Sequence, residues 1–239
     1  LTFATAPNFE DPGCGAGNDA NTCVVVIKVS DGLAGSADDT ITVTVTVQDA
    51  NDNTPTYSTS SNTQSIQENN QAVDTVQITD TDLDATNTNT CSLTGADASD
   101  FTCNADDDQY VLTFSSAPDY DTPGDADGNN IYTVVVAIND GTNTGSSITY
   151  TLTLTDYNDE VPTYSSSDTT PDVVEGQTAV ETVTITDTDS LDTNGCILGG
   201  ADADDFSCTI SPTQFVLAFA SAPDYDNPSD ADENNVYVV

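Results

Sequence analysis

The sequence predicts an all-β protein made of tandem Greek-key β-sandwich repeats arranged end to end. Three observations support this fold class. Segments such as "TITVTVTV" (40–47) and "ITYTLTLT" (148–155) alternate apolar residues with Thr, which is typical of half-buried antiparallel strands. No segment sustains a helical period. Long stretches of the chain also recur, and about seven short strands in a unit of about 107 residues favour a sandwich.

The internal repeats set the domain organisation. "LTFATAPNFEDPG" at residue 1 recurs as "LTFSSAPDYDTPG" at 112 and "LAFASAPDYDNPS" at 217, and "DANDNTP" at 49 recurs as "DYNDEVP" at 156. We therefore expect three parts: the C-terminal part of one repeat (1–56), a complete repeat (57–163) and the N-terminal part of a third (164–239). Because the sequence begins with Leu1, we expect a piece of a longer chain. Strand exchange between chains is less economical, since 217–239 duplicate the region of 1–26.

Further strands follow in order within the complete repeat. Alternation predicts strands at "VDTVQIT" (73–79), "YVLTF" (110–114) and "IYTVVVAI" (131–138), separated by clusters of Gly, Asn, Asp and Pro. Tyr57 and Tyr164 follow the prolines of the two links and are expected to pack against the start of the next sandwich.

Six cysteines form three close pairs in the sequence, Cys14/Cys23, Cys91/Cys103 and Cys196/Cys208. The chain contains no His that could complete a zinc site beside them. Local disulfides are the better interpretation, and they imply an oxidising, extracellular environment.

Charge excludes several classes of partner. The chain has 41 acidic residues, one basic residue (Lys28) and a formal net charge of −40. Nucleic acids and anionic membrane surfaces are bound through Lys and Arg, which this chain lacks. No run of about 18 apolar residues is present to cross a membrane. Cations are therefore the expected partners, and Lys28 is expected at a solvated strand position.

The acidic residues gather at the ends of the expected strands instead of being scattered. In a sandwich, strand ends meet at two poles, so Asp80, Asp82 and Asp140 are expected at one pole of the complete repeat and Glu68, Asp119, Asp121 and 156–160 at the other. Carboxylates about 4 Å apart repel by roughly 4 kcal/mol per pair at an effective dielectric near 20. Ca²⁺ would compensate this repulsion, because it accepts six to eight oxygen ligands in flexible geometry.

The motifs "DANDNTP", "IQEN", "DTD", "PDYD" and "INDG", in that relative order, resemble the calcium-binding motifs of cadherin repeats. The amino-acid sequence of the complete unit is most similar to cadherin-type repeats of large bacterial extracellular surface proteins. The resemblance implies about three Ca²⁺ ions per link between repeats. For the first link it implies side-chain or backbone oxygens from Glu10, Asp49, Ala50, Asn51, Asp52, Asn53, Asp80, Asp82, Asn89 and Asp140. For the second it implies Glu68, Asp119, Asp121, Asp156, Tyr157, Asn158, Asp159, Glu160, Asp187, Asp189 and Asn194.

Some residues depart from the motifs of this family. Asn8 stands where Asp119 and Asp224 stand in the later repeats, and Asp121 replaces the usual Glu. Glu160 replaces the last Asn of the link. The tract "GDADGNN" (124–130) resembles part of a calcium loop, but a hydrated surface loop is the preferred interpretation, and Glu175, the counterpart of Glu68, is expected to be structural.

These features favour a calcium-binding extracellular structural or adhesive protein that forms a rod or filament, with other copies or another surface protein as partner. A ligand- or carbohydrate-recognition module is the alternative. An enzyme is not expected: paired Asp residues can hydrolyse glycosides, but here the pairs recur in every repeat. About three ions at each of two links would still leave a charge of roughly −28, so a cell-surface location on a marine or salt-tolerant organism is expected.

Overall fold

The computed structural model describes residues 1–14, 21–32, 39–58, 61–82, 88–106, 108–165, 168–189 and 194–239. It divides into two compact units, one formed by Leu1–Pro118 with Pro123–Leu154 and the other by Asp119–Thr122 with Thr155–Val239. None of the helices in the described residues is long and apolar enough to span a membrane.

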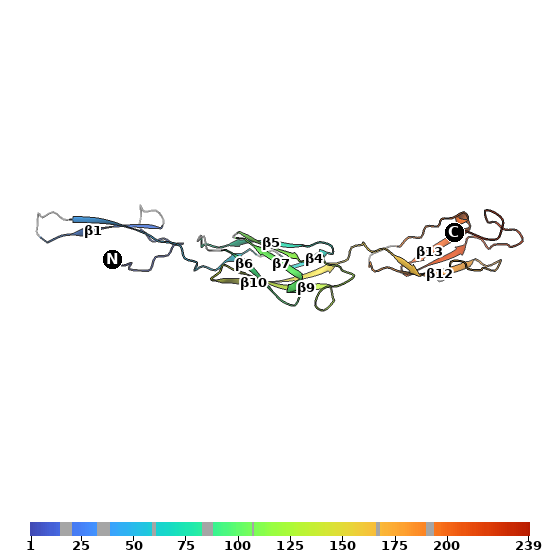
Figure 1. Cartoon of the computed structure of the whole chain (residues 1–239), viewed down its shortest axis with the longest axis horizontal. Helices are drawn as coiled ribbons and strands as arrows, with labels where there is room; N and C mark the ends of the chain where they lie inside the picture. The colour runs from blue at the N-terminus through green and yellow to red at the C-terminus, as the bar shows by residue number, and fades with distance from the viewer. Residues whose placement is uncertain are drawn as a thin grey trace. The chain divides into compact units, whose positions relative to one another are not determined.

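The first unit contains a sandwich of two four-stranded sheets (Figure 1). One sheet has the order β3-β5-β8-β7 and the other β4-β10-β9-β6. The chain changes sheet after β3, β4, β5, β6 and β8, which confirms the expected Greek-key connections. The strands are β3 (Thr56–Tyr57), β4 (Thr63–Gln67), β5 (Ala72–Thr79), β6 (Thr90–Thr94), β7 (Phe101–Ala105), β8 (Gln109–Phe114), β9 (Ile131–Asn139) and β10 (Thr144–Thr155).

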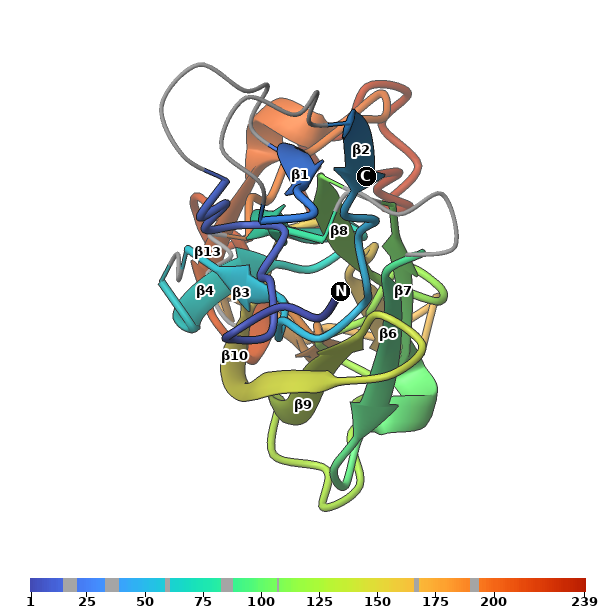
Figure 2. The same ribbon diagram turned by 90° about the vertical axis from the view of Figure 1, so that its left-hand side faces the viewer.

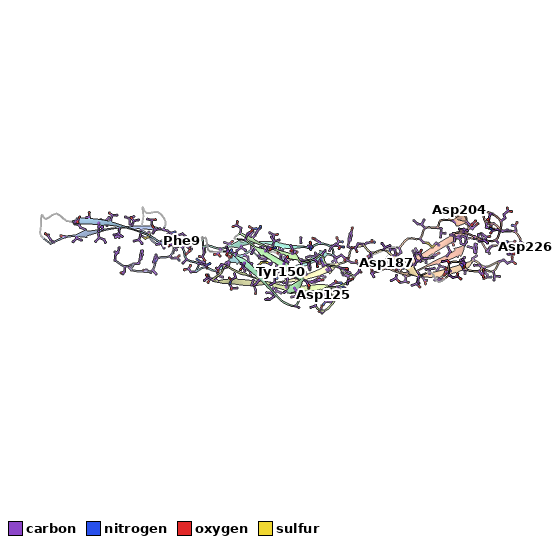
Figure 3. The ribbon with its side chains drawn as sticks, in the orientation of Figure 1. Phe9, Asp125, Tyr150, Asp187, Asp204 and Asp226 are labelled. Carbon is purple, nitrogen blue, oxygen red and sulfur yellow. A yellow bond between two sulfur atoms is a disulfide. The ribbon has the colours of Figure 1, made fainter. Side chains whose placement is uncertain are left out.

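Period-two alternation places one apolar row of each sheet in the core. In β9 the buried residues alternate with half-buried ones, and in β10 Ile148, Tyr150, Leu152 and Leu154 point inward between Thr residues. Figure 2 shows β9 and β10 side by side in one layer, where they pair in antiparallel register. Tyr150 lies inside the sandwich (Figure 3). Its hydroxyl donates to Asp74 (2.7 Å) and lies 2.8 Å from the hydroxyl of Tyr110.

The first unit also contains a two-stranded sheet of β1 (Thr22–Val29) and β2 (Asp39–Thr46). The second unit contains one sheet with the order β11-β12-β14-β13, built from β11 (Thr163–Ser165), β12 (Ala179–Thr186), β13 (Phe206–Ser211) and β14 (Gln214–Phe219). Lys28 is exposed on β1, as expected. Tyr57 and Tyr164 make edge-to-face contacts with Tyr110 on β8 and Phe215 on β14, so each packs inside the unit that contains it.

The same aromatic packing recurs in the two units. Phe101, Phe114 and Tyr132 form an aromatic cluster whose counterparts are Phe206, Phe219 and Tyr237, with nearly equal distances between the ring centroids: 4.6, 5.1 and 6.0 Å in the first cluster and 4.5, 4.9 and 5.9 Å in the second. A short 3-10 helix directly precedes the first Phe of each cluster: η1 (Ala98–Asp100) before Phe101 and η2 (Ala203–Asp205) before Phe206. The sequence analysis missed both helices.

All six cysteines are paired as the sequence predicted. Cys91 lies on β6 and Cys103 on β7, which belong to different sheets. This disulfide therefore links the two layers of the complete sandwich.

Candidate metal centres

The link between β2 and β3 is held against the complete sandwich by close backbone contact. Pro55 is fully buried. A Cβ atom added at Gly145, at the start of β10, would lie 2.6 Å from the carbonyl oxygen of Pro55. Only glycine leaves room for this approach, so the acidic residues just before Pro55 are fixed near the turn between β9 and β10.

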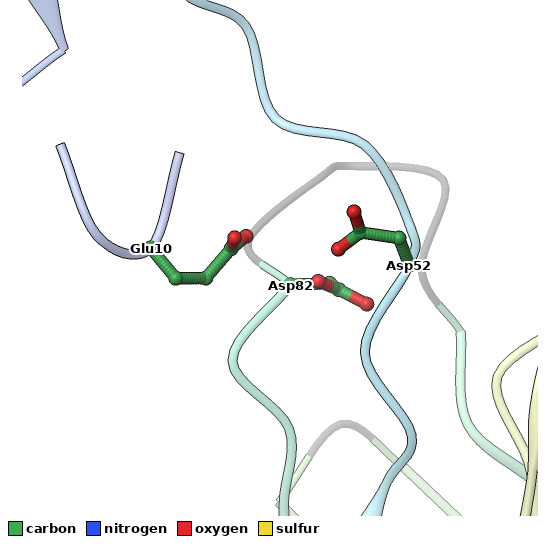
Figure 4. Close-up of side chains that lie close together, drawn as sticks. All are labelled: Glu10, Asp52 and Asp82. Carbon is green, nitrogen blue, oxygen red and sulfur yellow. The ribbon is translucent and has the colours of Figure 1, made fainter. Parts of the chain in front are cut away.

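Two groups of carboxylates meet at this link. Oxygens of Glu10, Asp52 and Asp82 all lie within 4.8 Å of one another (Figure 4). Oxygens of Asp80, Asp82 and Asp140 do the same. We call these five residues the first acidic cluster. Asp82 belongs to both groups, and the two most buried members are Asp82 (5% exposed) and Asp140 (1% exposed). The predicted meeting of Asp80, Asp82 and Asp140 at one pole is confirmed.

Hydrogen bonds favour the ionised form of Asp140 in this cluster. One of its oxygens accepts the N–H groups of Thr142 (2.7 Å) and Asn143 (2.5 Å). Burial acts to raise the pKa of Asp140, but these amides, with side-chain donors on Asn143 and Asn51, outweigh burial and lower its pKa. The carboxylate is therefore available as an anionic ligand across the neutral range.

Asparagine side chains organise the remaining oxygens. Asn53 donates its backbone N–H to one oxygen of Asp82 (2.9 Å) and its side-chain amide to the other (2.7 Å). The amide of Asn143 donates to Oδ1 of Asn51 (2.9 Å) and to the carbonyl of Asn53 (2.8 Å). These are two oxygens that the resemblance implied as ligands, and the structure places them around one amide. The sequence analysis missed Asn143, although its position three residues after Asp140 is a signal for a turn.

The second unit repeats this arrangement. Oxygens of Asp121, Asp156 and Asp189 lie within 4.8 Å of one another, and Asp156 and Asp189 are 8% and 6% exposed. We call these three residues, with Glu160 and Asp187, the second acidic cluster. Glu160 donates its backbone N–H to Asp189 (3.0 Å), as Asn53 does to Asp82. The N–H of Asp189 lies 3.4 Å from Oδ1 of Asp187, and the equivalent distance from Asp82 to Asp80 is 3.2 Å.

Several of these oxygens are buried without a hydrogen-bond donor. Within the described ranges, this holds for one carboxylate oxygen on each of Glu10, Asp80, Asp187 and Asp189. A buried anionic oxygen without a donor loses its hydration and gains nothing in return. The donor set contains carboxylate, amide and carbonyl oxygens but no imidazole or thiolate, which fits a hard cation such as Ca²⁺ and not a softer metal.

The remaining predicted ligands stay predictions. In the first unit Glu68 and Asn89 are buried, at 4% exposed each, and Asp49 is half-buried. In the second unit Asn158 and Asp159 are exposed and Asn194 is half-buried. Asp119 accepts the N–H of Thr122 (2.8 Å). Glu175, expected to be structural, accepts the N–H of Tyr225 (3.0 Å).

The tract 124–130 uses its acidic residues differently. Asp125, 7% exposed, accepts the N–H groups of Asn129 (2.9 Å) and Asn130 (3.0 Å), so its oxygens close a turn. Burial alone would raise its pKa, but these amides lower it. Nearby, Asp97 accepts the N–H groups of Ala126 (2.7 Å) and Thr133 (2.6 Å). The sequence analysis missed this role of Asp97. Its counterpart Asp202 accepts the N–H groups of Ala231 and Val238 in the same way.

Comparison with known proteins supports the architecture through structure alone. Neither a family model nor a curated protein sequence matches the chain. Solved structures do. Extracellular domains 3–6 of protocadherin gamma B7, from a cis-dimer structure, are 21% identical with a TM-score of 0.51, covering 92% of this chain and 52% of theirs. Domains 1–4 of protocadherin gamma B3 are 21% identical with a TM-score of 0.53, covering 86% and 50%.

Domains 1–3 of clustered protocadherin gamma C3 from mouse are 18% identical with a TM-score of 0.50, covering 92% of this chain and 71% of theirs. The chain thus spans about half the length of the two gamma B proteins. Likenesses at this level of identity show the fold. The chain has the fold of cadherin-like β-sandwich repeats.

Proposed function

We propose that this protein is a calcium-binding extracellular repeat protein with a structural or adhesive role, in which calcium at the links stiffens a row of repeats. The repeats would be those expected from the sequence, 1–56, 57–163 and 164–239. The observation that carries the proposal is the repeated gathering of carboxylates around the links, with at least one buried member in each group. Asp82 stands in two such groups and Asp189 stands in the equivalent position of the second cluster.

The chemistry of the clusters supports calcium in particular. Three carboxylates within 4.8 Å of one another in each group make a strongly negative centre, and mutual repulsion of about 3 kcal/mol per pair at an effective dielectric near 20 opposes this arrangement without a cation. When bound, Ca²⁺ would supply the compensating charge. Glu10, Asp52, Asp80, Asp82 and Asp140 would hold it at the first link, and Asp121, Asp156, Asp187 and Asp189 would hold it at the second.

The composition supports the environment that we propose. With 41 acidic residues against one Lys, surface ion pairs cannot offset the charge. High ionic strength shortens the Debye length from about 8 Å toward 3 Å and screens this self-repulsion. A bacterial cell surface in sea water or brine fits this requirement, and the three disulfides fit an oxidising exterior. Partners of the protein would be Ca²⁺ and other copies of itself or another surface protein.

Small-angle X-ray scattering of the chain with saturating calcium and with a chelator tests the proposal. With calcium we expect a rigid particle with a well-defined maximum dimension. With the chelator we expect the distribution of interatomic distances to broaden. A scattering curve that chelation leaves unchanged would contradict calcium stiffening. Calorimetric titration on the same sample would then separate failure to bind calcium from binding without stiffening.

A further inference from the structure

We propose that the last residue of each link sets the calcium affinity of its cluster: Asn53 weakens binding at the first acidic cluster, and Glu160 strengthens it at the second. This inference rests on the calcium binding proposed above. It concerns a difference within the chain, because the two links are otherwise closely alike, "DANDN" at 49–53 and "DYNDE" at 156–160.

The backbone places the two residues in the same way. The N–H of Asn53 donates to Asp82 at 2.9 Å, and the N–H of Glu160 donates to Asp189 at 3.0 Å. Asp82 and Asp189 are equally buried, at 5% and 6% exposed. The difference between the clusters at this position therefore lies in the side chain.

The side chain of Asn53 occupies the oxygens that a cation needs. Its amide donates to the second oxygen of Asp82 at 2.7 Å and to Asp52 at 3.1 Å. Both Asp82 and Asp52 belong to the first acidic cluster, so calcium binding has to weaken or replace these two hydrogen bonds. An amide that satisfies a carboxylate in the absence of metal stabilises the metal-free state and lowers the affinity.

Glu160 has no donor in its side chain and adds a negative charge. Among the described residues, Oδ1 of Asp189 is buried and accepts no hydrogen bond. This oxygen, on a side chain that is 6% exposed, belongs to the group that includes Asp121 and Asp156. Without metal, Asp189 is therefore less well satisfied than Asp82, both of whose oxygens accept from Asn53, and calcium binding recovers more free energy at this position of the second cluster.

The hydrogen bonds from Asn53 and the charge of Glu160 both favour tighter calcium binding at the second cluster than at the first. A unit charge at about 8 Å from a divalent ion in water changes the affinity by roughly fivefold. Loss of one competing hydrogen bond adds a factor of about two to ten. We expect exchange of Asn and Glu at this position to change the affinity of the cluster by about tenfold or more.

Terbium luminescence provides a reading specific to the second link. Tyr157 lies inside that link, where the first link has Ala50, and an excited Tyr transfers energy to nearby Tb³⁺. Loss of the signal in Tyr157→Phe would assign it to the second cluster. Calcium displacement of Tb³⁺ then gives the affinity of that cluster, and Ala50→Tyr in a Tyr157→Phe background gives that of the first.

In this assay we expect Glu160→Asn to weaken calcium binding at the second cluster by about tenfold and Asn53→Glu to tighten binding at the first by a similar factor. Glu160→Ala removes the charge without adding a donor, so it should give an intermediate loss. Thermal unfolding in chelator checks that each variant folds. Affinities that stay within twofold in Glu160→Asn and Asn53→Glu would overturn the inference while leaving calcium binding intact. Absence of any Tb³⁺ or Ca²⁺ binding would overturn the proposed function as well.

Discussion

Neutralising Asp82 should cost more stability in calcium than without it. Asp82 is the one residue shared by both groups of the first acidic cluster, so Asp82→Asn removes an anionic ligand from each. Without metal, two effects oppose each other. Relief of repulsion from carboxylates within 4.8 Å is worth about 1–3.5 kcal/mol per pair, depending on the effective dielectric. Weakening the charge-assisted hydrogen bonds from Asn53 costs about 1.5–3 kcal/mol each.

Because these two effects oppose each other, the loss of stability in chelator should be smaller than the loss in saturating calcium. Calcium at a hundred times its dissociation constant stabilises a native protein by about 2.7 kcal/mol per site. Because Asp82→Asn weakens both groups, we expect this stabilisation to fall to below about 1 kcal/mol. Urea unfolding of the wild type and the variant, with saturating calcium and with chelator, measures all four values.

Asp97→Asn is the matched control. Asp97 is 3% exposed and its two oxygens accept backbone N–H groups, but it lies in neither acidic cluster. Its replacement should destabilise the protein by about 1–3 kcal/mol to the same extent in both buffers. An equal loss of stability in both buffers for Asp82→Asn would refute the reasoning, because Asp82 would then be structural only.

Four further outcomes are expected. Replacing Cys91 and Cys103 by Ala should lower the free energy of unfolding, measured with urea, by about 3 kcal/mol. A change near zero would contradict a stabilising role for the disulfide that links the two sheets. Tyr150→Phe should cost about 1–3 kcal/mol through lost hydrogen bonds to Asp74 and Tyr110; thermal unfolding that matches the wild type would exclude this. The lowered pKa of Asp125 means that its contribution is complete above the unfolded value and lost as pH falls through the folded one. Asp125→Asn should therefore lose stability at pH 7, and its difference from wild type should shrink below about pH 4; a difference independent of pH down to acid unfolding would contradict it. Raising KCl from 0.1 to about 1 M should raise the melting temperature in chelator, because screening reduces the repulsion, and a fall would argue against salt adaptation.

The fold was predictable because its strands alternate cleanly. "VDTVQIT" gave β5 to within one residue, and the aromatic and aliphatic rows of β8 and β9 occupy the core as their period requires. The 3-10 helix η1 was missed because three residues are too few for a periodic signal. The register shift in β5, repeated in β12, also leaves no trace in a simple alternating pattern.

The candidate site was predictable in its acids but not in its amides. Carboxylates at strand ends converge at a pole, so Asp80, Asp82 and Asp140 followed from topology. The roles of Asn53 and Asn143 as donors depend on side-chain rotamers and turn geometry, which composition does not encode. Motif resemblance suggested the oxygens of Asn51 and Asn53 as ligands, but it gave no indication that an amide gathers them before metal binds.

The central claim, that calcium at a link fixes the orientation of successive repeats, is tested most directly by a distance across the first link. Spin labels at Thr44→Cys on β2 and Thr75→Cys on β5, both exposed positions, allow pulsed electron double resonance with saturating calcium and with chelator. A narrow distribution of distances in calcium that broadens in chelator is the predicted result. Equally narrow distributions in both conditions would show a link that is rigid without metal and would contradict the account.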